Sequence, residues 1–308
     1  MVEYPSENWR DYALIDSGNG EKLERFGSYI MARPEPKAIW TPSLSPGQWA
    51  AKMHTRFTPG AGFGKAGKED VGTWSKEKRM DEQWRIVYPG QQKGLRLDLR
   101  LGLTSFKHVG VFPEQAPNWE FIYSRTRALA ARASADNAPA PKVLNLFAYT
   151  GAASLAAKAA GADVTHLDSV RQVVNWARGN MDNTGLDGIH WVVEDAMKFA
   201  KREARRGHLY DGIILDPPAY GHGPDGERWK LDDCLFDMLR TVNLILKPKD
   251  SFLVLNLYSN GYSALLGETV VREAFGLKGD YKLESGELAL RDSFGKNLPL
   301  SIVVRLVR

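Results

Sequence analysis

Short apolar segments alternate with longer helical patterns through the second half of the chain, and this alternation constrains the fold more than any other feature. Strands fit residues 143–147, 163–167, 189–193, 212–215 and 252–257. Helical patterns such as "GAASLAAKAAG" and "SVRQVVNWARGNMDNTG" fill the intervals. Strands that alternate with helices form right-handed βαβ units, with helices on both faces of a parallel sheet. The sequence therefore predicts an α/β, Rossmann-like fold.

The end of the chain departs from this alternation. In "YKLESGELALRDSFGKNLPLSIVVRLVR" two strand patterns follow each other without an intervening helix. Such a hairpin adds an antiparallel strand to an otherwise parallel sheet. The complete sheet is expected to have seven strands, most of them parallel.

The first part of the chain is rich in Gly, Pro and Trp and lacks long helical patterns. Leu95, Leu97, Leu99 and Leu101 alternate with polar residues, as in a half-buried strand. The segment "TPGAGFGKAGKEDVGTWSKEKR" has few apolar residues and indicates a mobile loop. We predict a small β-rich unit over residues 1–115 and the α/β domain over residues 116–308.

Composition excludes several classes of protein. The chain has 43% hydrophobic and 25% charged residues, and no apolar run long enough to span a bilayer. Its start does not resemble a signal peptide, so we expect a cytoplasmic protein without a membrane partner. The single cysteine, Cys234, excludes an intrachain disulfide, and its helical pattern predicts a buried apolar position. The six scattered histidines predict no metal site.

The turn after the first strand of the α/β domain reads "NLFAYTGAAS". A dinucleotide fold uses G-x-G-x-x-G here to bring the backbone close to a pyrophosphate. This turn has one glycine and two aromatic residues, Phe147 and Tyr149, which suit a flat or apolar ligand better than a phosphate. Thr150 is in position to cap the helix that follows.

Acidic residues follow the next two strands. Asp168 is placed by βαβ geometry to bind a ribose diol, and Asp195 or the next backbone N–H can meet an adenine edge. Each residue has an alternative role as a helix N-cap. Their recurrence at successive strand ends favours an adenosine ligand without a phosphate, such as S-adenosylmethionine.

The fourth strand runs directly into Asp216-Pro217-Pro218, and Tyr220 follows one residue later. Two prolines fix the backbone and remove two N–H donors. A stiff cluster of acceptors beside an aromatic ring suits methyl transfer to a nitrogen in a planar group, because Asp216 and the Pro217 carbonyl can accept from an amino group while Tyr220 stacks. The alternative is a rigid loop with a strand-ending acid.

The segment from about Lys142 to the C-terminus resembles the class I S-adenosylmethionine-dependent methyltransferases. The pair "NLFAYTGAAS" and "LDPPAYG" is similar to the bacterial 23S ribosomal RNA methyltransferases, and "FKHVGVFPEQAPNW" resembles a segment that precedes the catalytic domain in one branch of them. The resemblance implies a cofactor site lined by Asn145, Phe147, Tyr149, Thr150 and Gly151. It also implies Asp168 with Ser169 at the ribose, Asp195 with Ala196 at the adenine, and Asp216, Pro217, Pro218 and Tyr220 at the methyl group and its acceptor.

Two departures from that group limit the expected chemistry. The fifth strand ends "LNLYSNGYS" without a cysteine, which argues against methylation of a pyrimidine carbon through a cysteine adduct. The aromatic residue follows the two prolines after Ala219, whereas adenine-N6 and glutamine-N5 methyltransferases place it directly after them. The prediction is in-line methyl transfer to a base nitrogen in ribosomal RNA.

Other substrates and roles stay open. Methylation of a protein side chain or a small molecule is one alternative, and a module that binds S-adenosylmethionine or RNA without turnover is another. The basic segment 198–208 and a loop with Lys65, Lys68, Lys76, Lys78 and Arg79 are candidate phosphate-binding surfaces or simply solvated faces. Lys107 and His108 can enter the active site from the small unit or lie on a surface hairpin.

Overall fold

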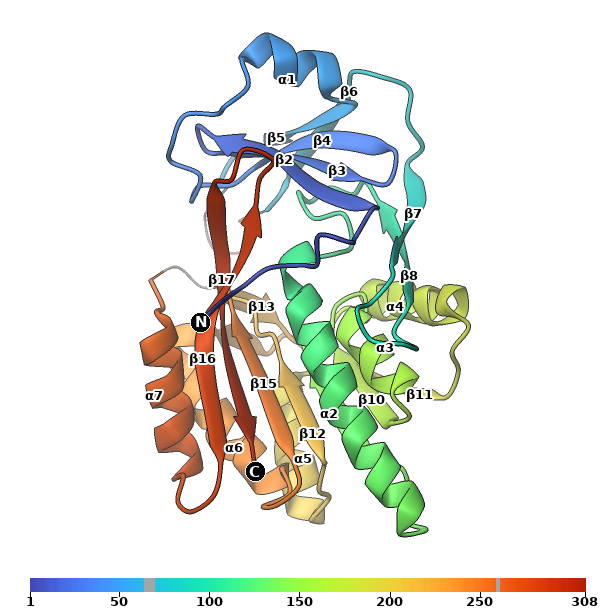
Figure 1. Cartoon of the computed structure of the whole chain (residues 1–308). Coiled ribbons are helices and arrows are strands. Elements are labelled where there is room, and N and C mark those ends of the chain that lie inside the picture. Colours follow the sequence, from blue (N-terminus) through green and yellow to red (C-terminus); the bar gives the residue numbers. More distant parts are fainter. Residues whose placement is uncertain (64–69, 259–260) are drawn as a thin grey trace.

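The computed structural model describes residues 1–63, 70–258 and 261–308. Figure 1 shows a mixed sheet with its helices in the lower half and a smaller β-rich unit above it. The N-terminal part of the chain supplies most of the upper unit, and the part from α2 onward supplies most of the lower one. The α/β class and the β-rich unit predicted from the sequence are both observed.

The central sheet of the described residues has eight strands in the order β1-β16-β17-β15-β12-β9-β10-β11. Their bounds are β1 Val2–Glu3, β9 Lys142–Leu146, β10 Asp163–Asp168, β11 Ile189–Val193, β12 Gly212–Leu215, β15 Phe252–Leu257, β16 Lys282–Arg291 and β17 Asn297–Val307. Strand β17 runs antiparallel to both β15 and β16, which confirms the expected final hairpin. The expected strand number was too low, because β1 pairs in parallel with β16.

Helices cover both faces of this sheet. Helices α2 (Ala116–Ala135) and α3 (Ala152–Ala159) pack on one face through buried side chains such as Ile122 and Leu155. Helices α5 (Ala196–Arg206), α6 (Leu231–Ile245) and α7 (Ala264–Phe275) cover the other face with Phe199, Leu239 and Val271. Helix α4 (Arg171–Thr184) joins α3 to the β-rich unit through its contacts with β8.

The order of the strands sets the place of a ligand site. Strands β9, β10 and β11 proceed outward on one side, and the chain then returns to β12 on the opposite side of β9. All of these strands are parallel, so their carboxyl ends lie at the same edge of the sheet. Ligands in open α/β sheets bind beyond that edge at the point where the strand order reverses. Here that point lies between β9 and β12.

The β-rich unit lies above this edge (Figure 1). It consists of a five-stranded sheet, helix α1 (Pro46–Lys52) and a hairpin, with strands β2 Tyr12–Gly18, β3 Glu21–Phe26, β4 Tyr29–Pro34, β5 Thr55–Pro59, β6 Gly72–Lys76, β7 Gln83–Tyr88 and β8 Leu97–Gly102. The tip of the β16–β17 hairpin is bonded to it, since Lys296 Nζ lies 2.8 Å from Asp16 Oδ1 and Ser17 donates to Asp292. The β-rich unit is therefore connected to the α/β domain both by the covalent chain that leads into α2 and by the β16–β17 hairpin.

Local differences from the sequence predictions have identifiable causes. Part of the segment expected to be a mobile loop forms strand β6, because its residues pair with those of β5. Lys65 and Lys68 of that segment lie outside the described residues. Cys234 is only partly buried, since it packs at the margin of the α6 cluster of Leu231, Leu235, Met238 and Leu239. In the described part of the chain, no helix is both long and apolar enough to cross a bilayer.

Candidate active site

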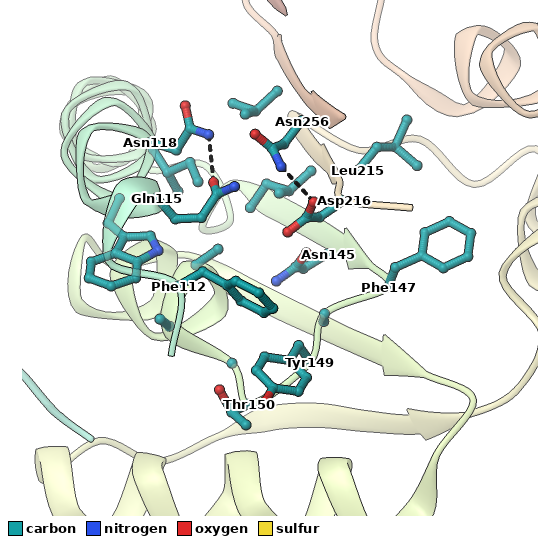
Figure 2. A pocket seen from close by; sticks show the side chains of 18 of the residues that line it. Phe112, Gln115, Asn118, Asn145, Phe147, Tyr149, Thr150, Leu215, Asp216 and Asn256 are labelled. Atoms are coloured by element: carbon teal, nitrogen blue, oxygen red, sulfur yellow. Dashed lines mark hydrogen bonds between the residues drawn. The ribbon is translucent and has the colours of Figure 1, made fainter. Parts of the chain in front are cut away.

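A pocket opens at the expected switch point (Figure 2). Four segments line it: the start of α2 with the short 3-10 helix before it (Pro113–Gln115), the turn after β9, the end of β12, and the end of β15. The polar and aromatic side chains of its wall are Phe112, Gln115, Asn118, Trp119, Asn145, Phe147, Tyr149, Thr150, Asp216 and Asn256. Five of the predicted cofactor residues thus meet one predicted catalytic residue, Asp216.

The turn after β9 has an unusual backbone. Phe147 and Tyr149 adopt positive φ angles of 58° and 50°, which non-glycine residues rarely do, and Gly151 has φ 92°. Asp168 secures the turn, because its Oδ2 accepts from the Tyr149 N–H at 2.9 Å while its Oδ1 accepts from the Val170 N–H at 3.0 Å. Strained backbone of this kind persists where the surrounding structure holds it, often at functional sites.

A buried chain of side chains supports the same turn from below. Asn145 donates to the hydroxyl of Ser154 at 2.9 Å, and this hydroxyl lies 2.9 Å from Nδ1 of His166. Burial lowers the pKa of His166 to about 3, so the imidazole is neutral and its Nδ1 can accept the Ser154 proton. The amide of Asn145 is thereby held at the floor of the pocket.

Thr150 does not cap the following helix as expected. Its hydroxyl donates instead to the carbonyl of Gly110 at 2.7 Å, and Gly151 takes the N-cap position of α3 without a side-chain hydrogen bond. Asn180 of α4 in turn donates to the Thr150 carbonyl at 2.9 Å. Thr150 therefore joins the turn to the segment that leads from the β-rich unit into α2.

Asp216 is the ionisable group at the centre of the pocket (Figure 2). Burial raises its pKa to about 7, although a hydrogen bond of 2.7 Å from Asn256 Nδ2 opposes this rise. Asn256 is itself fixed, because Ser301 donates to its oxygen at 2.9 Å. A carboxyl with this pKa can accept or release a proton near neutral pH.

The residues after Asp216 leave the pocket. Pro218 accepts a hydrogen bond of 2.7 Å from the indole of Trp229, and the ring of Trp229 lies 4.9 Å from that of Phe147. Tyr220 belongs to strand β13 (Tyr220–His222), which pairs with β14 (Arg228–Lys230), and is 43% exposed. Among the described residues that line the pocket, Pro217, Pro218 and Tyr220 are not found, so their predicted contact with an acceptor stays a prediction.

The acids after β10 and β11 differ in their structural roles. Asp195 is the N-cap of α5, with its carboxylate accepting from the Lys198 N–H at 2.8 Å, which is the alternative role given to it above. Asp168 is not a helix cap but an acceptor for the turn, and burial raises its pKa. The pocket wall in the described chain does not include Asp168, Ser169, Asp195 or Ala196, and their contact with an adenosine stays a prediction.

Several pocket residues were not predicted from the sequence. Phe112 and Gln115 precede the predicted α/β domain, Asn118 lies in its first helix, and Asn256 lies at the end of β15. The ring of Phe112 lies 5.2 Å from those of both Tyr149 and Tyr258. The sequence signal for these residues is the segment "FKHVGVFPEQAPNW", whose resemblance to the methyltransferases does not by itself indicate a contribution to the site.

Lys107 and His108 lie just outside the pocket. Both contact Asp70, with Lys107 Nζ at 2.8 Å and His108 Nε2 at 3.0 Å from its carboxylate oxygens. The ring of His108 lies 4.8 Å from that of Phe112, so a single aromatic side chain separates it from the pocket. Burial lowers the pKa of His108.

A parallel sheet with a pocket at the carboxyl edge of its strands is the architecture of an α/β-class methyltransferase. A family model described as S-adenosylmethionine-dependent methyltransferase matches residues 53–289. The chain belongs to this family. Its cofactor is S-adenosylmethionine.

Solved structures and curated proteins agree with this assignment. The crystal structure of an S-adenosylmethionine-dependent methyltransferase from Agrobacterium tumefaciens is 38% identical, with a TM-score of 0.85 over 99% of this chain and 92% of that one. The ribosomal RNA large subunit methyltransferases K/L of Shewanella frigidimarina (strain NCIMB 400) and Shewanella baltica (strain OS155 / ATCC BAA-1091) are 30% and 28% identical over 51% and 78% of this chain. The matched segments span only 21% and 29% of those proteins.

The pocket suits this cofactor chemically. The described wall contains no lysine or arginine, so a pyrophosphate would have no cationic partner there, whereas S-adenosylmethionine has no phosphate. Phe112 and Tyr149 offer flat apolar surface, and the amides and carboxyl of the wall can pair with an amino-acid group. The described residues contain no group of three or more His, Cys, Asp or Glu side chains that could hold a metal ion.

Proposed function

We propose that this chain methylates a base nitrogen in the RNA of the large ribosomal subunit. The names of the Shewanella relatives support the substrate class, and the position of Asp216 in the pocket is the observation that carries the proposed chemistry. A ribosomal substrate would place the protein in the cytoplasm.

In this proposal the turn after β9 holds the cofactor. The cofactor-binding residues are Asn145, Phe147, Tyr149, Thr150, Gly151, Asp168 with Ser169, and Asp195 with Ala196. Support comes from the strained backbone of the turn and from Asp168, whose carboxylate is bonded to Tyr149. Each Asp168 oxygen accepts one backbone N–H, which leaves lone pairs free for a ribose diol.

Methyl transfer in this proposal centres on Asp216. The cofactor supplies an activated methyl group, so the protein needs mainly to align the acceptor and exclude water. Asp216 accepts a hydrogen bond from the acceptor nitrogen and can take its proton, because its pKa of about 7 lies near neutral pH. Pro217, Pro218 and Tyr220 stiffen and flank this acceptor side.

The proposed route needs no cysteine adduct. Cys234 lies in α6 and is not part of the described pocket wall. A nitrogen acceptor is itself a nucleophile, so direct in-line displacement is sufficient.

The test is transfer of labelled methyl from S-adenosylmethionine to total RNA from cells that lack this protein, with a protein extract assayed in parallel. Asp216→Ala should transfer little methyl even when S-adenosylmethionine is raised to saturation. Asp250→Asn is the matched control, because Asp250 pairs with Arg132 at the exposed C-terminal end of α2. We expect label in large-subunit RNA. Label only in protein would indicate a protein methyltransferase, and tight cofactor binding without any label would indicate a non-catalytic binder.

A further inference from the structure

A buried hydrogen-bond chain connects both ends of the polypeptide to the pocket. Arg305 of β17 is 4% exposed and forms a bidentate pair with Glu3 of β1, at 2.8 and 2.7 Å. The same guanidinium donates to Oδ1 of Asn118 from Nε at 3.1 Å and from Nη2 at 2.7 Å. Asn118 is 1% exposed and lies in the first turn of α2, on the wall of the pocket.

The polarity of this chain follows from the chemistry of arginine. A guanidinium donates but cannot accept, so Asn118 must turn its oxygen toward Arg305 and its nitrogen away. Asn118 Nδ2 then donates to Gln115 Oε1 at 2.7 Å, and Gln115 Nε2 donates to the Tyr258 hydroxyl at 3.1 Å. Tyr258 has one proton, which it donates to Glu114 Oε1 at 2.9 Å.

The consequence reaches the ligand side of the wall. Figure 2 shows the Gln115 oxygen turned toward Asn118 and the Gln115 nitrogen on the opposite side of that amide. Both oxygen lone pairs of Asn118 are used by Arg305, so only its second N–H remains for a ligand. The α2 side of the pocket therefore offers amide N–H groups, while Asp216 offers carboxyl oxygens.

We propose that Arg305, held by Glu3, is a positioning residue that orients Asn118 and Gln115 to receive the carboxylate at the amino-acid end of the cofactor. This inference rests on the proposed cofactor site. The amino-acid end carries one acceptor group, the carboxylate, and one donor group, the ammonium. The ammonium fits the Asp216 side and the carboxylate fits the amide side, where the N-terminal end of α2 also favours a negative group.

The inference predicts a selective loss of affinity. Without Arg305, the Asn118 amide loses the donors that fix its oxygen, so it can flip and present oxygen to the carboxylate and to Gln115. S-adenosylhomocysteine has the amino-acid end, whereas 5′-methylthioadenosine has the same adenosine and sulfur without it. Only the first ligand should be sensitive to the orientation of these amides.

The experiment measures the binding of both ligands by titration calorimetry. Arg305→Met should weaken S-adenosylhomocysteine binding by about 10-fold to 100-fold, as expected for a lost hydrogen bond to a charged group. The affinity for 5′-methylthioadenosine should change by no more than about 2-fold, which is the size of effect expected for a substitution that does not touch the ligand. Arg305→Lys keeps a residue that can only donate, and should recover most of the affinity.

Two further variants keep the test decisive. Asn118→Ala breaks the hydrogen-bond chain but keeps the Arg305–Glu3 pair, so its binding of the two ligands can be measured even if Arg305→Met folds poorly. If Arg305 acts through Asn118, the double variant should lose no more affinity for S-adenosylhomocysteine than Asn118→Ala alone. Lys296→Met is the matched control, because Lys296 also joins the C-terminal hairpin to the N-terminal region through Asp16 but, among the described residues, has no hydrogen bond to the pocket wall. It should lower stability without changing the ratio of the two affinities.

An equal loss for both ligands, or no loss for either, would overturn the positioning role of Arg305. Failure of the wild-type chain to bind S-adenosylhomocysteine at all would instead refute the proposed cofactor site. The two failures are therefore distinguishable in one set of titrations.

Discussion

Asp216→Asn should make the protein more stable while it abolishes methyl transfer. The substitution keeps the size of the side chain and retains an oxygen for the hydrogen bond from Asn256. It removes a buried group that can become charged. The cost of that charge can be estimated from the pKa of Asp216, which burial raises from 3.8 to about 7.

The sign and size of the effect follow from proton linkage. Between pH 4 and pH 7 the unfolded chain has lost the proton of residue 216, while the folded chain retains it, so the free energy of unfolding of the wild type falls over this window. Above pH 7 the fall is complete and amounts to about 4 kcal/mol. Asp216→Asn lacks this term. The difference in free energy of unfolding between Asp216→Asn and the wild type should grow from near zero at pH 4 to a plateau above pH 7.

Urea denaturation at pH 4, 5, 6, 7 and 8 would measure this difference directly. Asp16→Asn is a control of opposite sign: burial alone would raise the pKa of Asp16, but hydrogen bonds from Lys296, Leu44 and Trp49 lower it to about 2. Its loss should destabilise the protein by a similar amount at all five pH values, because the folded and unfolded pKa values of Asp16 both lie below 4. A stability gain of Asp216→Asn that does not change with pH would refute the reasoning.

Three substitutions in the turn after β9 test its construction. Gly151→Ala should destabilise the fold by about 1–3 kcal/mol, measured by thermal denaturation, because Gly151 has φ 92° and a Cβ there would lie 3.0 Å from Ala177. Thr150→Val should cost about 1–3 kcal/mol in urea denaturation, since it leaves the carbonyl of Gly110 without its donor. Asp168→Asn should weaken S-adenosylhomocysteine binding about 10-fold in calorimetry, because one amide oxygen cannot accept both backbone N–H groups that the carboxylate binds. Unchanged stability for the first two, or unchanged affinity for the third, would contradict the assigned contacts.

The strands of the α/β domain were predictable because their sequence signals are local. Buried parallel strands are continuous apolar runs bounded by turn residues, and β11, β12 and β15 begin and end where the sequence indicated. Strand β1 had no such signal. It has two residues and exists only because β16, more than 280 positions away, offers it an edge.

The site was predictable to the extent that the catalytic domain supplies it. Asn145 lies near the end of β9 and Asp216 directly follows β12. These two strands are neighbours at the switch point, so the order of the strands places the two residues together. Gln115 and Asn118 were not predictable, because neither residue type is diagnostic on a helix and their role depends on Arg305, almost 190 positions later. Asp195 shows the reverse case, since its N-cap hydrogen bond accounts for the residue without any ligand.

If the proposed cofactor site is right, the charge balance of the pocket favours the cofactor over its product. Asp216 has only a neutral partner, Asn256, and no cation in the described pocket wall offsets its negative form, which is why burial raises its pKa. Glu114, connected to the wall through Tyr258, adds to this effect. Under the proposed function, the ligand brings the missing positive charge as an ammonium and a sulfonium, and it loses the sulfonium charge when the methyl group leaves. The same carboxylate that orients the acceptor therefore binds the methyl donor more tightly than the demethylated product, which assists product release at the end of each turnover.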